Sequence, residues 1–125
     1  MINAIINLLA VSIGGTIGAE SRYYLTGKIK FKNPIPFGTY IVNVSGSFGL
    51  GIFVELTKLL PIPSWLVLFI ATGFFGCFTT MSTFAVESLG LAELSRKLAI
   101  ENIVLMIFSV LLGALLGESI LSLIK

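Results

Sequence analysis

The chain has 125 residues, of which 56% are hydrophobic and only 11% are charged, and its mean hydropathy is +1.04. An average soluble domain carries about 25% charged residues, so this composition excludes a water-soluble domain and favours an integral membrane protein. The single cysteine excludes an intrachain disulfide, the absence of histidine argues against an enzyme, and the small net charge of +2 argues against nucleic-acid binding.

The length suits four membrane crossings, because each transmembrane helix needs about 20 apolar residues and only short connections then remain. The apolar runs are far too long for the strands of a membrane barrel, which need about 10 residues. We therefore predict an all-α membrane protein with one domain, 1–125, and four transmembrane helices at about 2–25, 38–58, 64–93 and 100–124.

The first predicted helix, 2–25, begins with a stretch that lacks the basic start of a secretory signal, so we interpret it as a retained helix. Gly14 and Gly18 are four residues apart, a spacing that lets two helix backbones approach closely in a membrane. Arg22 lies near the end of this run, where its side chain is expected to extend to the membrane interface and to attract anions.

A polar stretch at 26–36 with two prolines is typical of a loop and precedes the second predicted helix, 38–58. One face of that helix consists of small or polar residues, namely Thr39, Asn43, Ser45, Gly46, Ser47, Gly49 and Gly51. The Asn43 amide has two possible roles, as a donor to an anion or as a hydrogen-bonding contact to a neighbouring helix. Sequence position alone does not decide between them.

The third predicted helix, 64–93, follows two prolines and starts beside Trp65, which suits the membrane interface. As one continuous helix it would be about 43 Å long, against a membrane core of about 30 Å. We predict a break near 76–79, where glycines and hydroxyls lie at mid-membrane depth. The hydroxyls that follow, together with freed carbonyls, either line an ion site or bond back within a plain kink.

The fourth predicted helix, 100–124, repeats the glycine spacing at Gly113 and Gly117. Asn102 and Ser109 are its polar positions inside an otherwise apolar run. Polar groups at such positions cost free energy unless a partner or an aqueous path receives them.

Basic residues in the connections predict the orientation of the helices. Those of the first and third connections are Lys28, Lys30, Lys32, Arg96 and Lys97, and those of the opposite end are Lys58 and Lys125. This moderate bias places the first and third connections in the cytoplasm and both termini outside.

Three segments in this order resemble the Fluc/CrcB family of fluoride channels. They are Gly14-Gly15-x-x-Gly18-Ala19-x-x-Arg22-Tyr23, Gly38-Thr39-x-x-Val42-Asn43-x-x-Gly46-x-Phe48 and Gly73-Phe74-x-Gly76-x-x-Thr79-Thr80-x-Ser82-Thr83-Phe84. Each segment is weak by itself, but their order and spacing, with the four-helix pattern, cover nearly the whole chain.

The resemblance implies an antiparallel dual-topology dimer in the cytoplasmic (inner) membrane, with two pores that passively export fluoride and lower its toxicity. It also implies a structural sodium ion on the dimer axis, held by the backbone carbonyls of Gly76 and Thr79, and a vestibule arginine at Arg22. With the polar positions above, the predicted fluoride pore comprises Asn43, Met81, Ser82, Thr83, Phe84 and Ser109.

Met81 is the main departure from the family pattern, in which two phenylalanines occupy the positions of Met81 and Phe84. Methionine is polarizable but lacks the electropositive ring edge that would face an anion. We therefore expect the fold and sodium site to be retained and fluoride throughput to be altered or reduced.

Two alternatives remain open. A small four-helix proton-coupled drug exporter would need a carboxylate at mid-membrane depth, whereas the glutamates here lie near the ends of the predicted helices. A non-transporting structural subunit would explain the glycine spacing but not the polar residues. The charge bias leaves the partner open as well, because it fits either a second copy of the chain or an oppositely oriented paralogue.

Overall fold

The computed structural model describes residues 2–29 and 35–123, and these residues are almost entirely helical. The elements are α1 (Ile2–Lys28), α2 (Phe37–Leu59), α3 (Ser64–Val67), η1 (Leu68–Phe75), α4 (Gly76–Phe78), α5 (Met81–Leu94) and α6 (Arg96–Ser122). Residues 30–34 of the predicted loop and residues 124 and 125 lie outside the described part.

Four helical stretches are long and apolar enough to cross a membrane: Ile2–Lys28, Phe37–Leu59, Ser64–Leu94 and Arg96–Ser122. The predicted all-helical, four-span class is therefore confirmed, and the chain is a multi-pass membrane protein. The third span combines α3, η1, α4 and α5.

The span boundaries differ from the hydropathy-based ones mainly at charged residues. The first helix continues beyond residue 25 to Lys28, and the fourth starts at Arg96 instead of residue 100. A hydropathy pattern assigns charged residues to the connections between helices. Long basic side chains at a helix end can, however, reach the membrane interface while their backbone stays helical.

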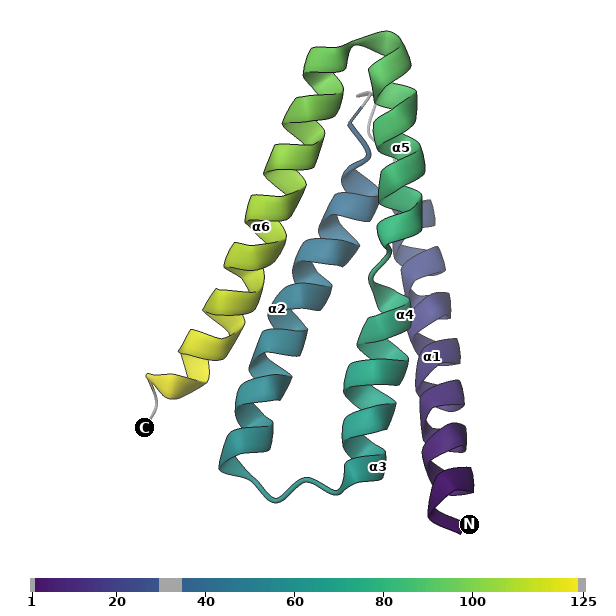
Figure 1. The fold of residues 1–125 in the computed structure, drawn as a ribbon, viewed down its shortest axis with the longest axis vertical. Helices are drawn as coiled ribbons and strands as arrows, with labels where there is room; N and C mark the ends of the chain where they lie inside the picture. Colours follow the sequence, from purple (N-terminus) through teal and green to yellow (C-terminus); the bar gives the residue numbers. More distant parts are fainter. Residues whose placement is uncertain (1, 30–34, 124–125) are drawn as a thin grey trace.

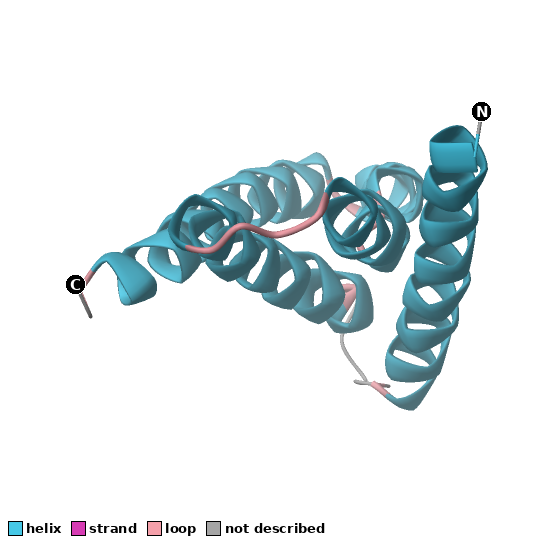
Figure 2. Ribbon diagram, turned by 90° about the horizontal axis from the view of Figure 1, so that it is seen from below, coloured by secondary structure: helices cyan, strands magenta, loops and turns pink. Residues whose placement is uncertain are grey.

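The four spans form an open row in which α2 lies between α6 on one side and the third span on the other (Figure 1). Viewed from below, α1 and α6 lie at opposite edges of the molecule (Figure 2). The most extensive helix contacts are those between α2 and α6 and between α1 and η1. The bundle is thus two closely packed helix pairs joined through the middle of the row.

Glycines at the two pair interfaces permit this close approach. A Cβ atom built on Gly18 would collide with the Phe74 carbonyl oxygen, and one on Gly117 would collide with the Phe48 carbonyl oxygen. Backbones in direct contact gain dispersion energy that larger side chains would prevent. The predicted role of the four-residue glycine spacings, close approach between helix backbones, is therefore confirmed.

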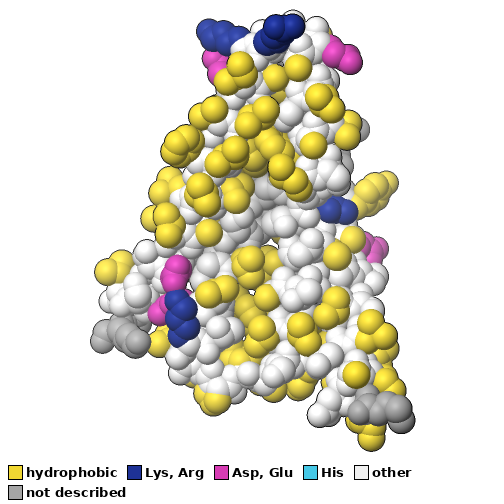
Figure 3. All heavy atoms as spheres, in the orientation of Figure 1, with side chains coloured by type: hydrophobic (Ala, Val, Ile, Leu, Met, Phe, Trp, Pro, Cys, Tyr) yellow, Lys and Arg dark blue, Asp and Glu magenta, His cyan; other side chains and the backbone are white. Residues whose placement is uncertain are grey.

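Apolar side chains are spread over the face of the molecule that Figure 3 shows, with the charged side chains mainly near its ends and edges. Leu8 is 68% exposed, Phe108 70% and Leu115 61%, whereas Val42 is the largest side chain that is fully buried. Exposure of this extent would be costly in water and is expected where the surrounding medium is lipid.

An ion-paired group joins the ends of α2 and α6. Lys58 Nζ lies 2.9 Å from Glu55 Oε2, and it also pairs with Glu118 Oε1. Lys58, a basic residue at this end of the molecule, is therefore ion-paired with two carboxylates.

Candidate functional site

The third span is interrupted at Thr79 and Thr80. Thr79 (φ −78°, ψ 156°) and Thr80 (φ −146°, ψ 119°) are extended, so α4 stops at Phe78 and α5 starts at Met81 (Figure 1). Thr80 is the N-cap of α5, because its hydroxyl accepts a hydrogen bond from the Thr83 backbone N–H at 3.2 Å. We call residues 76–83 the interruption segment.

Asn43 on α2 holds this segment in place through both ends of its amide. Its Oδ1 accepts a hydrogen bond from the Thr80 N–H at 2.7 Å, and its Nδ2 donates to the Thr80 carbonyl at 3.0 Å. Nδ2 also lies 3.9 Å from Met106 Sδ, and the Asn43 side chain is buried. Of the two roles left open by the sequence, the structure shows the helix-to-helix contact, while a pore role for Asn43 stays a prediction.

The carbonyls of Gly76 and Thr79 do not accept hydrogen bonds from the backbone amides that would donate to them in a continuous α-helix. The Thr80 amide, four residues after Gly76, donates to Asn43 Oδ1 instead. The Thr83 amide, four residues after Thr79, donates to the Thr80 hydroxyl instead. The ligands that the family resemblance implies for sodium are carbonyl oxygens at this interruption, and oxygen is the ligand atom that a hard cation prefers.

Arg22 points into the bundle. Its Nη1 donates to the Thr79 carbonyl at 3.4 Å, and the side chain is partly buried. This carbonyl gives the guanidinium a partner within the bundle, and the expected extension of the side chain to the membrane interface stays a prediction. A positive charge now lies beside the interruption segment, and its role in a vestibule stays a prediction.

The remaining predicted pore residues lie in different surroundings. Phe84 is 5% exposed, whereas Met81 is 74% exposed at the first turn of α5. Ser82 and Thr83 are also exposed, and Thr83 Oγ1 is 3.0 Å from the Thr80 hydroxyl. These positions are consecutive in the sequence, but the helical turn of α5 directs only Phe84 into the protein.

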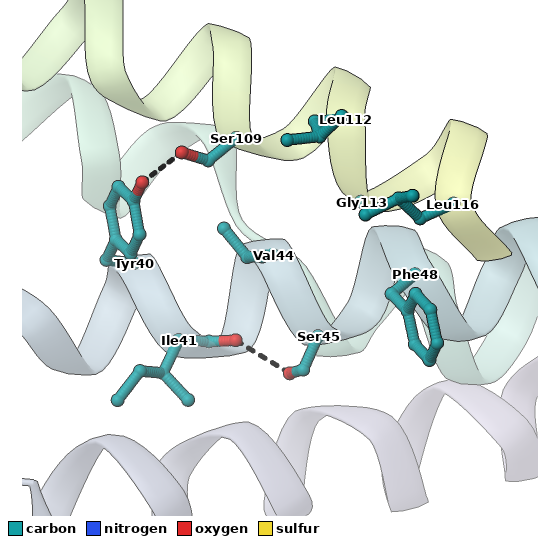
Figure 4. Close-up of a pocket in the computed structure, with 9 residues that line it drawn as sticks. All are labelled: Tyr40, Ile41, Val44, Ser45, Phe48, Ser109, Leu112, Gly113 and Leu116. Atoms are coloured by element: carbon teal, nitrogen blue, oxygen red, sulfur yellow. Dashed lines mark hydrogen bonds between the residues drawn. The ribbon is translucent and has the colours of Figure 1, made fainter.

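Ser109 on α6 forms a hydroxyl pair with Tyr40 on α2, a contact that Figure 4 shows across the gap between the two helices. The pair lies in a groove of about 600 Å³ between α2 and α6. The other residues that line the groove are Ile41, Val44, Ser45, Phe48, Leu112, Gly113 and Leu116. Ser109 is thus part of a mostly apolar groove with few hydroxyl groups.

Sequence reasoning missed three polar contacts of this region. Tyr40, which was not among the predicted site residues, pairs with Ser109, and Thr39 donates to Glu87 Oε1 at 2.8 Å. Among the described residues, Glu87 Oε2 is a buried oxygen without a hydrogen-bond partner. Asn102 Nδ2 donates to the Ser88 hydroxyl at 3.0 Å. The signal available for the first two contacts was the polar face of 38–58, but the partners of Thr39 and Tyr40 lie 48 and 69 residues away in the chain.

Comparison with known proteins gives a consistent result over nearly the whole chain. The family model described as CrcB-like protein, Camphor Resistance (CrcB), matches residues 9–118. A protein of Ruminiclostridium cellulolyticum named fluoride-specific ion channel FluC is 39% identical over 117 residues, which are 90% of each chain.

Two further relatives carry the same name with a number. Fluoride-specific ion channel FluC 2 of Rhodopseudomonas palustris is 37% identical over 119 residues, 88% of each chain. Fluoride-specific ion channel FluC 1 of Listeria innocua is 45% identical over 89 residues, 70% of this chain and 72% of the relative. The family model and these relatives together show that the chain belongs to the CrcB-like protein family.

Proposed function

We propose that this chain is a subunit of a fluoride-selective ion channel that lets fluoride leave the cell passively and so lowers its toxicity. The observation that carries the proposal is the 39% identity, over 90% of both chains, to a relative named fluoride-specific ion channel. The four apolar spans supply the membrane setting that a channel requires. The cytoplasmic membrane is the site that passive export from the cell requires.

The groove between α2 and α6 supports an assembly of two subunits. It is lined by residues of those two helices only, with the Tyr40 and Ser109 hydroxyls in an otherwise apolar surface. An ion in such a groove would meet lipid unless a second wall closed it, and lipid cannot hydrate or bind an anion. We propose that a second subunit in the opposite orientation provides this wall, so that each pore has residues from both subunits.

The interruption segment supports a structural sodium ion. The Gly76 and Thr79 carbonyls have lost their helical donors to Asn43 and Thr80, and the Thr79 carbonyl has only a long contact of 3.4 Å from Arg22 Nη1, which a bound cation would have to displace or share. Two such carbonyls from each of two subunits would supply four oxygen ligands. When bound, the ion would compensate these carbonyl dipoles at the subunit interface.

Two polar features of the interruption segment fit an anion path beside it. Arg22 holds a positive charge near Thr79, which raises the local concentration of anions. The exposed hydroxyls of Ser82 and Thr83 offer hydrogen-bond donors at the start of α5. Donors of this type replace part of the hydration shell that fluoride loses on entering a narrow passage.

The test is fluoride efflux from liposomes that contain the purified chain. A fluoride electrode would record efflux after the membrane potential is collapsed with a potassium ionophore, and chloride-loaded liposomes would serve as the selectivity control. We expect rapid fluoride efflux and little chloride efflux. Equal release of both ions, or no release by a properly folded and assembled chain, would overturn the proposal.

A further inference from the structure

The Tyr40 and Ser109 pair retains a proton that it can offer to a ligand. Each hydroxyl carries one hydrogen, and the bond between them uses only one of the two. When Tyr40 carries the second proton, the Leu105 carbonyl is its acceptor within the chain, and the distance of 3.5 Å from Tyr40 Oη is long for an O–H donor. Whichever hydroxyl donates within the pair, one O–H group is left for a stronger acceptor.

Three other polar residues of this part of α2 have their donors engaged. Ser45, which also lines the groove, donates to the Ile41 carbonyl at 2.6 Å. The neighbouring Thr39 donates to Glu87, and Asn43 donates to the Thr80 carbonyl. Among the described residues that line the groove, the Tyr40 and Ser109 pair is therefore where a hydroxyl donor remains for an anion.

Tyr40 also lies between two cavities. It lines the groove of about 600 Å³ that contains Ser109. It lines a second cavity of about 230 Å³ as well, together with Ile35, Phe37, Asn102 and Leu105. The Tyr40 side chain thus borders both spaces, and its hydroxyl contacts Ser109, which lines the first, and lies 3.5 Å from the carbonyl of Leu105, which lines the second.

We propose that Tyr40 is a specificity-determining residue of the pore, whose hydroxyl, paired with Ser109, donates a hydrogen bond to fluoride between the two cavities. The proposal rests on the fluoride-channel function proposed above. A hydrogen bond from a neutral hydroxyl to an anion is shorter and stronger than one between neutral groups. Fluoride is the smaller and more strongly hydrated halide, so it depends on such donors more than chloride does.

The experiment compares Tyr40→Phe with Tyr24→Phe. Tyr40→Phe keeps the ring and removes the hydroxyl from the pair. Tyr24→Phe removes a hydroxyl that meets Lys28 on the exposed surface of α1, so it controls for the loss of one tyrosine hydroxyl. We expect Tyr40→Phe to lower fluoride efflux per liposome-inserted channel about tenfold and to lower the permeability ratio of fluoride to chloride, whereas Tyr24→Phe changes neither.

A cycle with Ser109→Ala tests whether the two hydroxyls act as one station. If they do, the double variant Tyr40→Phe with Ser109→Ala loses no more fluoride efflux than the stronger single variant. Independent losses that multiply would contradict a shared station.

The permeability ratio separates a role in selection from a purely structural role. Fewer folded channels would lower the efflux of every ion but leave the ratio unchanged, and that result for Tyr40→Phe would overturn the inference. Tyr40→Phe behaving as Tyr24→Phe, with an active unaltered chain, would overturn it as well. An unaltered chain without fluoride efflux would instead reject the proposed function on which the inference rests.

Discussion

Asn43 connects two parts of the chain that lie 37 residues apart. Its amide bonds both the N–H and the C=O of Thr80, a buried residue whose N–H has no helical acceptor at the interruption. An amide suits this position because it is the neutral side chain that presents both a donor and an acceptor in one plane. The same residue therefore fixes the course of the third span, whatever it contributes to ion passage.

Asn43→Ala should destabilise the protein by about 1–3 kcal/mol, because the buried Thr80 N–H would lose its acceptor and an unsatisfied buried group costs about this much. Denaturant titration in mixed micelles would measure the free energy of unfolding. Asn3→Ala is the matched control, because Asn3 is exposed at the start of α1, and it should change this free energy by less than about 0.5 kcal/mol. Equal stability of the two variants would show that the Asn43 contacts contribute little.

Met81→Phe tests the main departure from the family pattern. Met81 is 74% exposed, so a phenyl ring fits there without displacing the core. The ring edge is electropositive and contacts an anion favourably, which the thioether does not. We expect fluoride efflux several times faster in Met81→Phe and no acceleration in Met81→Leu, an apolar control without a ring edge. Equal rates in these two variants would rule out the ring edge as the cause.

At the scale of elements, the pairing of helices depends on glycines whose spacing is visible in the sequence. Gly14 and Gly18 face η1, and Gly113 and Gly117 face α2. The polar and small face of α2 indicated contact with protein, and the structure places α6 and the third span against it. These features were predictable because helical periodicity is a property of neighbouring residues.

Features that depend on contacts between residues far apart in the sequence were not predictable in the same way. The extended residues Thr79 and Thr80 depend on Asn43, which is remote in the sequence. The π-helical segment Leu68–Phe75 has i→i+5 hydrogen bonds, for which the sequence carries no distinct hydropathy pattern. The contact of Arg22 with the Thr79 carbonyl likewise joins residues 57 positions apart. Tertiary contacts decided each of these features.

Gly117→Ala should weaken the α2–α6 pair. Its Cβ would collide with the Phe48 carbonyl and lie 3.0 Å from the Ile52 nitrogen, so the helices must separate. Overpacking of this kind typically costs about 1–3 kcal/mol. Gly90→Ala is the control, because its Cβ would meet nothing within 4 Å, and it should leave stability equal or slightly higher. Unfolding in mixed micelles would compare them, and similar values would argue against close packing at Gly117.

At the scale of the whole molecule, basic residues are distributed unevenly between the two ends. Five lie in or beside the first and third connections and two at the opposite end, where Lys58 is paired with Glu55 and Glu118. A chain that inserts equally in both orientations needs nearly balanced ends. The proposed antiparallel dimer therefore depends on how strongly this bias acts during insertion.

Arg96→Gln with Lys97→Gln should make insertion more even, because it reduces the bias from five against two to three against two. Both residues are exposed at the start of α6, and the Lys97–Glu101 contact of 3.7 Å contributes little to stability. Protease access to a C-terminal tag in oriented vesicles would measure the fraction in each orientation. We expect the two fractions to approach one half, with a higher yield of dimer and more fluoride efflux per purified chain.

The matched control is Glu93→Gln with Glu101→Gln at the same end, because acidic residues have little influence on orientation. It should leave the two fractions as they are in the unaltered chain. If the basic double variant becomes evenly inserted without gaining dimer or efflux, two copies of this chain do not form the channel. The wall of its groove would then have to come from an oppositely oriented paralogue, and co-expression with such a chain should restore efflux.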